Sequence, residues 1–127
     1  MRYLTYDTLL KIHEDQVQSF GGDPGIRDRE LLKSIHRQPF QTFGDKEVYP
    51  SLFEKSAALG HGIVANHPFV DGNKRTGAVS MILLLEINGY RFEATNSELV
   101  EKILDVARGN VTKEELSNWL KIHSEEK

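Results

Sequence analysis

The chain contains no cysteine among its 127 residues. Without thiols it can form neither a disulfide framework nor a thiolate zinc site, and catalysis by a nucleophilic cysteine is excluded. Any bound metal ion must therefore be held by oxygen or imidazole ligands.

Excess positive charge and long apolar runs are also missing. The 16 Lys and Arg residues are outnumbered by 19 Asp and Glu residues, so the net charge is −3 and offers no general attraction to nucleic acid or an anionic membrane. The most apolar stretch, residues 77–87, is shorter than the about 20 residues that cross a bilayer. The first residues lack the apolar core of a signal peptide. We expect a cytoplasmic protein that binds neither nucleic acid nor membrane directly.

The composition that remains is typical of a globular domain, with 39% hydrophobic and 28% charged residues and no linker or repeat. The length predicts one domain over residues 1–127. Apolar residues recur three or four positions apart, and Ser, Thr or Asp stands where helices should begin. The expected helices span residues 5–20, 29–37, 51–66, 73–88, 96–108 and 112–123, with caps at Thr5, Asp28, Ser51, Thr95 and Thr112.

Two segments refine this all-α prediction. Residues 38–50 lose the helical period and place aromatic and β-branched residues around Gly44-Asp45, which favours a short β-hairpin or flap. Residues 77–87 are apolar on all sides, which indicates a buried helix. The predicted fold is a helical bundle with a central buried helix and a short β-hairpin flap.

The segment His67–Thr76, with the sequence HPFVDGNKRT, does not have the pattern of a purely structural connection, and it leads into the buried helix. The first turn of a helix has unpaired N–H groups and a partial positive charge, and it binds phosphate-like anions. Gly72 lets the backbone approach a ligand, and Asn73 can cap the helix or donate from its amide. Lys74 and Arg75 oppose the helix dipole, a cost that an anionic ligand would offset.

Two further side chains supply reactive groups. Asp71 offers a carboxylate for Mg²⁺, which binds to one or two carboxylates together with substrate phosphates. His67 is suited to accept a proton from a hydroxyl group near pH 7. Together with residues 72–75 they supply what phosphoryl or nucleotidyl transfer requires.

Each of these features taken alone has a simpler interpretation. A single loop histidine is more often a surface or capping residue, Asp-Gly a turn, and Lys-Arg a solvated pair. Their combination at one helix entry favours function. Phe69 is interpreted as a core anchor, and the other histidines, which lack ligand spacing, as packing or surface residues: His13, His36, His61 and His123. Gly72 and Gly77 have the spacing of a P-loop, but Ala78 and Val79 replace its Lys and Ser/Thr.

The nonapeptide HPFVDGNKR, residues 67–75, resembles the motif of the Fic/Doc family and is similar to its death-on-curing branch. The resemblance implies an all-α Fic fold with ATP as co-substrate. It implies that His67 is the base for a target hydroxyl and that Asp71 binds Mg²⁺. It also assigns the nucleotide phosphates to Gly72, Asn73, Lys74 and Arg75.

Two positions depart from the AMP-transferring pattern HPFx(D/E)GNGRxxR, because Lys74 replaces its second glycine and Ala78 its last arginine. The death-on-curing branch has the same lysine and binds the nucleotide reversed. This likeness implies a kinase-like toxin that transfers the γ-phosphate to a Ser or Thr of a host protein, elongation factor Tu being the family's known case, and arrests translation. AMP transfer to a protein hydroxyl and a catalytically silent binding module are the alternatives.

Some Fic proteins inhibit themselves through an [ST]-x-x-x-E-[GN] helix, which this chain lacks. Its nearest string, Ser97–Lys102, ends in lysine. The resemblance therefore implies that a separate antitoxin chain inhibits the protein, as in a type II toxin–antitoxin pair.

Overall fold

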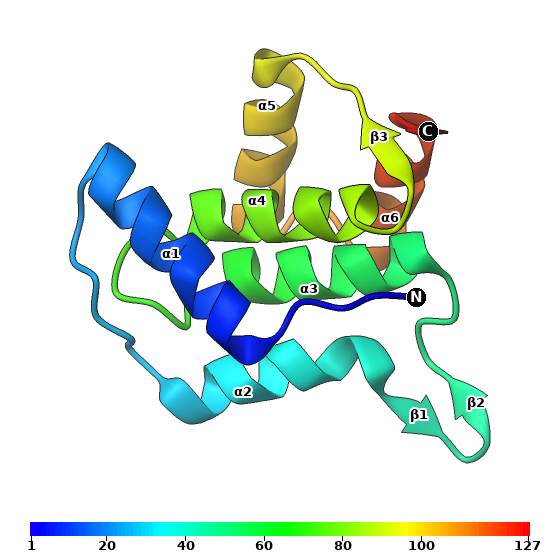
Figure 1. Ribbon diagram of the computed structural model, residues 1–127, viewed down its shortest axis with the longest axis horizontal. Helices are drawn as coiled ribbons and strands as arrows, with labels where there is room; N and C mark the ends of the chain where they lie inside the picture. The colour runs from blue at the N-terminus through cyan, green and yellow to red at the C-terminus, as the bar shows by residue number, and fades with distance from the viewer.

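The computed structural model describes residues 1–127 and contains six α-helices (Figure 1). The helices are α1 (Tyr6–Phe20), α2 (Arg29–Arg37), α3 (Leu52–Asn66), α4 (Asn73–Glu86), α5 (Asn96–Ala107) and α6 (Lys113–Ile122). A 3₁₀ turn, η1 (Gln38–Phe40), follows α2, and the short strands are β1 (Thr42–Phe43), β2 (Lys46–Glu47), β3 (Tyr90–Phe92) and β4 (Ser124–Glu126). The predicted all-α fold is confirmed, and every expected helix is present.

Most of the helices begin at a side-chain cap, as the sequence predicts. The caps that accept a backbone N–H are Thr5, Asp28, Ser51, Thr95 and Thr112. The capping boxes of α5 and α6 are complete. Ser51 and Glu54 have the same spacing at the start of α3 but form no complete box, because the Glu54 carboxylate accepts from the Ser51 hydroxyl instead of the Ser51 amide.

Helices α3 and α4 form the antiparallel centre of the bundle (Figure 1). They can approach closely because Gly60 faces Gly77, and a Cβ atom on Gly77 would lie 3.0 Å from the Gly60 carbonyl oxygen. One apolar cluster packs α5 and α6 against this pair, and a second packs α1, α2 and the N-terminal segment against it. Helix α4 is therefore the central buried helix that the sequence predicts.

The predicted hairpin forms from β1 and β2, which pair across Gly44-Asp45. Figure 1 shows it near the start of α3, whereas the loop of residues 67–72 follows the other end of that helix. Lys55 holds the hairpin, since its buried ammonium group donates to the Glu47 carboxylate at 2.8 Å and to the Tyr49 carbonyl oxygen.

The partner of strand β3 was not predicted from the sequence. Strand β3 pairs antiparallel with the C-terminal strand β4. The sequence of β4, Ser-Glu-Glu, is polar throughout and has no alternating pattern. Its pairing depends on backbone hydrogen bonds that the side chains do not reveal.

Candidate functional site

The loop of residues 67–72 begins with a backbone conformation that is uncommon for a residue other than glycine. His67 ends α3 with φ 51°, and its N–H donates to the Ile63 carbonyl oxygen at 3.2 Å. The guanidinium of Arg27 donates to the carbonyl oxygens of Asn66, at 2.8 Å, and of His67. The exposed imidazole of His67 has no hydrogen bond within the protein, so both of its ring nitrogens can meet a ligand.

The same loop is paired with the segment before α2. The amides of Arg27 and Asp28 donate to the Pro68 carbonyl oxygen at 2.8 and 3.0 Å, and the Val70 amide donates to Gly25 at 3.0 Å. Phe69 is completely buried, as predicted for a core anchor. The loop is therefore fixed on both sides of its apolar anchor.

The start of α4 differs from that of the other helices because no side chain caps it. Gly72 is the N-cap, with φ 79°, a left-handed conformation that glycine adopts without strain. The N–H groups of Gly72, Asn73, Lys74 and Arg75 have no acceptor within the protein. Four unpaired amides thus add to the positive end of the helix dipole, an arrangement that favours an anion.

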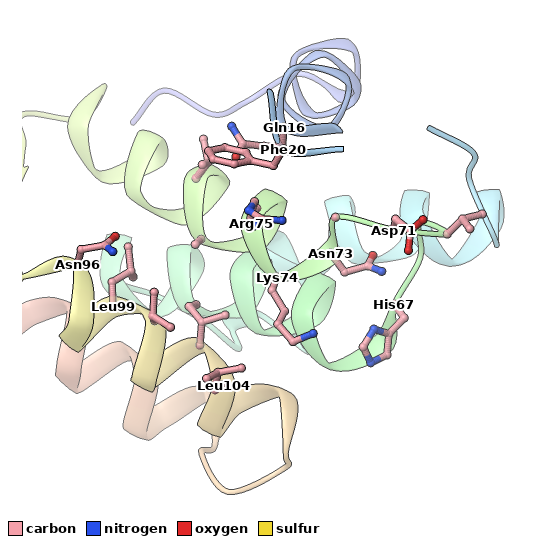
Figure 2. A pocket seen from close by; sticks show the side chains of 16 residues that line it. Gln16, Phe20, His67, Asp71, Asn73, Lys74, Arg75, Asn96, Leu99 and Leu104 are labelled. Atoms are coloured by element: carbon pink, nitrogen blue, oxygen red, sulfur yellow. The ribbon is translucent and has the colours of Figure 1, made fainter. Parts of the chain in front are cut away.

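All six candidate residues line one cavity of about 760 Å³ (Figure 2). Its polar end consists of His67, Asp71 and residues 72–75. The rest is largely apolar and comes from α1, α4 and α5: Phe20, Ala78, Val79, Leu99, Val100, Ile103 and Leu104. The polar end, which favours anions, is called the mouth of the cavity below, and the apolar residues form its wall.

The two cations of the motif point in different directions. Figure 2 shows Lys74 on the side of His67 and Arg75 turned toward Phe20. The Arg75 guanidinium carbon lies 4.5 Å from the centre of the Phe20 ring. Phe20 continues the apolar period of residues 5–20, which predicts a place on the buried face of that helix, but its ring is 60% exposed because the last turn of α1 extends over the cavity.

Asn73 is the candidate whose side chain is already occupied. It is buried, its Nδ2 donates to the Phe69 carbonyl oxygen at 2.9 Å, and its Oδ1 accepts from the Phe69 amide at 3.0 Å. The side chain braces the loop and leaves the backbone N–H as the group with which Asn73 can meet a phosphate.

The carboxylate of Asp71 is half occupied. Its Oδ2 accepts from the Asp23 amide at 2.8 Å, and its Oδ1 has no hydrogen-bond partner. No three His, Asp or Glu side chains gather as a metal cage anywhere in the chain. One free carboxylate oxygen fits an ion such as Mg²⁺, which completes its shell with phosphate oxygens and water, and the unpaired amides nearby suit those phosphates.

Several residues around the site escaped the sequence analysis. Arg27 and Asp23 hold the loop, and Gln16 and the apolar wall of α5 line the cavity. His13 was expected to be a packing or surface residue. It is indeed buried, and it also contacts the motif, because its Nε2 lies 2.8 Å from the Asp71 carbonyl oxygen. No local pattern signals these contacts, which join positions far apart in the chain.

Comparisons with known proteins agree with the motif. The sequence profile of the Fic/DOC family matches residues 3–85. The toxin Doc of Mycolicibacterium smegmatis is 40% identical over 76 residues, which cover 60% of this chain and 58% of that protein. The protein kinase doc of Escherichia phage P1 is 27% identical over 121 residues, 95% of this chain and 94% of that protein. The match therefore spans less than two thirds of the mycobacterial toxin but nearly all of the phage kinase.

Proposed function

Since the chain belongs to the Fic/Doc family, we propose that it is the toxin of a type II toxin–antitoxin pair and that it phosphorylates a Ser or Thr hydroxyl of a host protein with ATP. Two relatives support this proposal by name, one as a toxin and the other as a protein kinase. The structural observation that carries it is the uncapped start of α4 beside His67 and Asp71.

The four free amides of residues 72–75 would bind the nucleotide phosphates. Oriented backbone N–H groups at a helix start stabilise phosphate oxygens without rearranging during the reaction. Lys74 and Arg75 add two positive charges at the same mouth. Binding there places the terminal phosphate near the loop that carries His67.

The transfer step then requires a base for the target hydroxyl. His67 accepts the hydroxyl proton, the hydroxyl oxygen forms a bond to the γ-phosphorus, and the bond from that phosphorus to the β-γ bridging oxygen breaks. ADP leaves with the electron pair of the broken bond. His67 is suited to this role because its imidazole is exposed in the cavity and has no competing hydrogen bond.

A magnesium ion held by Asp71 and the phosphates would neutralise charge on the nucleotide. The free Oδ1 of Asp71 is the ligand that the chain offers. The Asp23 amide on the other oxygen fixes the carboxylate and lowers the entropy that it loses on binding the ion.

Two positions favour γ-phosphate transfer over AMP transfer. Lys74 occupies the place where a glycine would let the phosphates lie against the backbone, and its side chain extends into the cavity. Ala78 lines the cavity where an arginine would clamp the far end of the nucleotide. Both replacements disfavour the AMP-transferring orientation.

The apolar wall of the cavity suits an antitoxin segment. Two of its side chains are largely exposed next to the mouth of the cavity, Val100 at 48% and Phe20 at 60%. A disordered segment that folds onto this wall would bury these side chains and block the nucleotide. As the host target we propose elongation factor Tu.

The test is incubation with elongation factor Tu, Mg²⁺ and ATP labelled at either the γ- or the α-phosphate. We expect label on the target from γ-labelled ATP only. His67→Ala should abolish labelling without lowering the melting temperature, because the imidazole makes no contact that stabilises the fold. His123→Ala, a histidine outside the cavity, serves as the control.

The other outcomes identify the alternatives. Label from the α-phosphate alone would show AMP transfer and refute the kinase proposal. If neither label reaches elongation factor Tu, the same assay with a cell lysate tests for a different target. Growth arrest that persists in His67→Ala would indicate a binding module.

A further inference from the structure

The peptide bond between Asp71 and Gly72 is held by a residue from a distant helix. His13 of α1 is 3% exposed, and its Nε2 lies 2.8 Å from the Asp71 carbonyl oxygen. A carbonyl oxygen can only accept, so Nε2 must carry the proton and donate it. The imidazole is also stacked on the buried ring of Phe69, with centroids 3.7 Å apart and an angle of 7° between the planes. The hydrogen bond therefore comes from a ring that cannot easily turn.

This contact fixes the direction of an N–H group at the mouth of the cavity. In a trans peptide the C=O and the following N–H point to opposite sides. With the Asp71 oxygen turned toward His13, the Gly72 N–H points away from α1. That N–H has no acceptor in the protein, and Gly72 lines the cavity. It is the first of the four free amides.

Glycine makes this orientation easy to lose. Without a Cβ atom the peptide before Gly72 can rotate at little steric cost. A rotated peptide would present a carbonyl oxygen to the mouth and repel a phosphate. The hydrogen bond from His13 to the Asp71 oxygen therefore does more than pack the helix against the loop, because it keeps this peptide from rotating.

We propose that His13 is a positioning residue for phosphate binding, which it serves by holding the Asp71–Gly72 peptide with its N–H toward the ligand. The nature of the ligand rests on the proposed function. His13 does not touch the phosphates or the reacting hydroxyl. It acts through the backbone of the motif, in the same way for substrate and for any other phosphate at this mouth.

Two substitutions separate the hydrogen bond from the packing. His13→Phe keeps an aromatic ring against Phe69 and removes the donor. His13→Gln removes the ring and keeps an amide near the position of Nε2. If His13 serves only packing, His13→Phe should be the better tolerated of the two variants. If His13 positions the peptide, His13→Gln should bind phosphate more tightly than His13→Phe.

The experiment measures the affinity for inorganic pyrophosphate by calorimetry and the kinetics with ATP, on the full chain with matched melting curves. We expect His13→Phe to weaken pyrophosphate binding about tenfold, the effect of one lost hydrogen bond to a charged group, and to raise KM more than it lowers kcat. His13→Gln should recover affinity to within about threefold of the wild type. Equal affinity of His13→Phe and the wild type, or lower affinity of His13→Gln than of His13→Phe, would overturn the proposal.

A second measurement does not depend on how the variants fold. In the ¹⁵N-labelled wild-type protein, the amide signal of Gly72 must shift when pyrophosphate is added. A Gly72 signal that stays in place at saturation refutes the role of His13, as does a wild-type protein that binds no pyrophosphate.

These results also separate the proposal from the proposed function. If the wild-type protein binds pyrophosphate through Gly72 and His13→Phe weakens that binding more than His13→Gln does, but no γ-phosphate is transferred, the results contradict the kinase and support the role of His13. A wild-type protein that transfers phosphate as fast as His13→Phe, with equal KM, contradicts only the role of His13.

Discussion

Arg27 holds the backbone of His67 from a distance of 40 residues along the chain. Its guanidinium donates to the carbonyl oxygens of both Asn66 and His67, at the point where α3 ends in a left-handed residue. A backbone conformation with φ 51° costs free energy for any residue other than glycine. The contacts of Arg27 offset this cost and fix the direction from which the imidazole leaves the backbone.

Arg27→Met should therefore lower both stability and transfer. Losing two charge-assisted hydrogen bonds is expected to lower the free energy of unfolding by about 1–3 kcal/mol. The lower end of this range applies if water replaces the lost partner, since both hydrogen bonds are exposed. Urea denaturation measures this loss, and label transfer to the target measures the effect on His67. Arg29→Met is the matched control, since Arg29 is exposed and makes none of these contacts. Equal losses in the two variants would contradict the role of Arg27.

Asn73→Ala should destabilise the protein more than it weakens phosphate binding. The substitution leaves the N–H and C=O of the buried Phe69 without partners, a cost of about 2 kcal/mol. Urea denaturation of Asn73→Ala against the exposed control Asn118→Ala measures it. An unchanged free energy of unfolding together with a large loss of pyrophosphate affinity would show that the side chain binds the ligand directly.

Gly77→Ala should destabilise the bundle although alanine is the better helix former. A Cβ atom on residue 77 would lie 2.6 Å from Cγ2 of Val64 and 3.0 Å from the backbone oxygen of Gly60. Overpacking in a core costs about 1–3 kcal/mol, and a contact this short, with a backbone atom as second neighbour, belongs at the upper end of that range, above the gain of about 1 kcal/mol in helix propensity. The double variant with Val64→Ala removes part of the overlap, so its loss of stability should be smaller than the sum of the two single losses. Strict additivity would contradict the contact.

Stability should fall as the pH is lowered through the range in which His61 titrates. Desolvation by burial lowers the pKa of His61, the hydrogen bond to the Val111 carbonyl oxygen opposes this shift, and the nearby charge of Lys113 adds to it. Below the ordinary histidine pKa of about 6.5 the unfolded chain takes up a proton that folded His61 resists. The contribution of neutral His61 to the free energy of unfolding is therefore complete above that pH and is lost as the pH falls below it.

Urea denaturation at pH 7.5 and pH 5.5 tests this expectation. The difference between the two free energies of unfolding should be smaller in His61→Gln than in the wild type. A larger or unchanged difference would show that His61 does not resist protonation in the folded state.

The helices were predictable because their signals are local. A cap such as Thr95, its partner Glu98 three residues later and the apolar period behind them lie within a few turns of one helix. The motif from His67 to Arg75 was visible for the same reason, since a short loop and the first turn after it keep consecutive residues together. The pairing of β3 with β4 was not visible, because a polar strand such as Ser124–Glu126 has no pattern of its own.

The candidate site was only partly predictable. The residues that hold it, His13 and Arg27, look like ordinary helix and loop residues until the chain folds. The sequence alone determined which groups could do chemistry and that they follow one another at the entry to a buried helix. Only the tertiary structure decided that this helix start stays uncapped, that the Asn73 side chain braces the loop, and that α1 and α5 enclose the cavity. The reason is physical: a helix cap or period arises from neighbours in sequence, whereas the orientation of a loop peptide depends on hydrogen bonds from segments that only folding brings near.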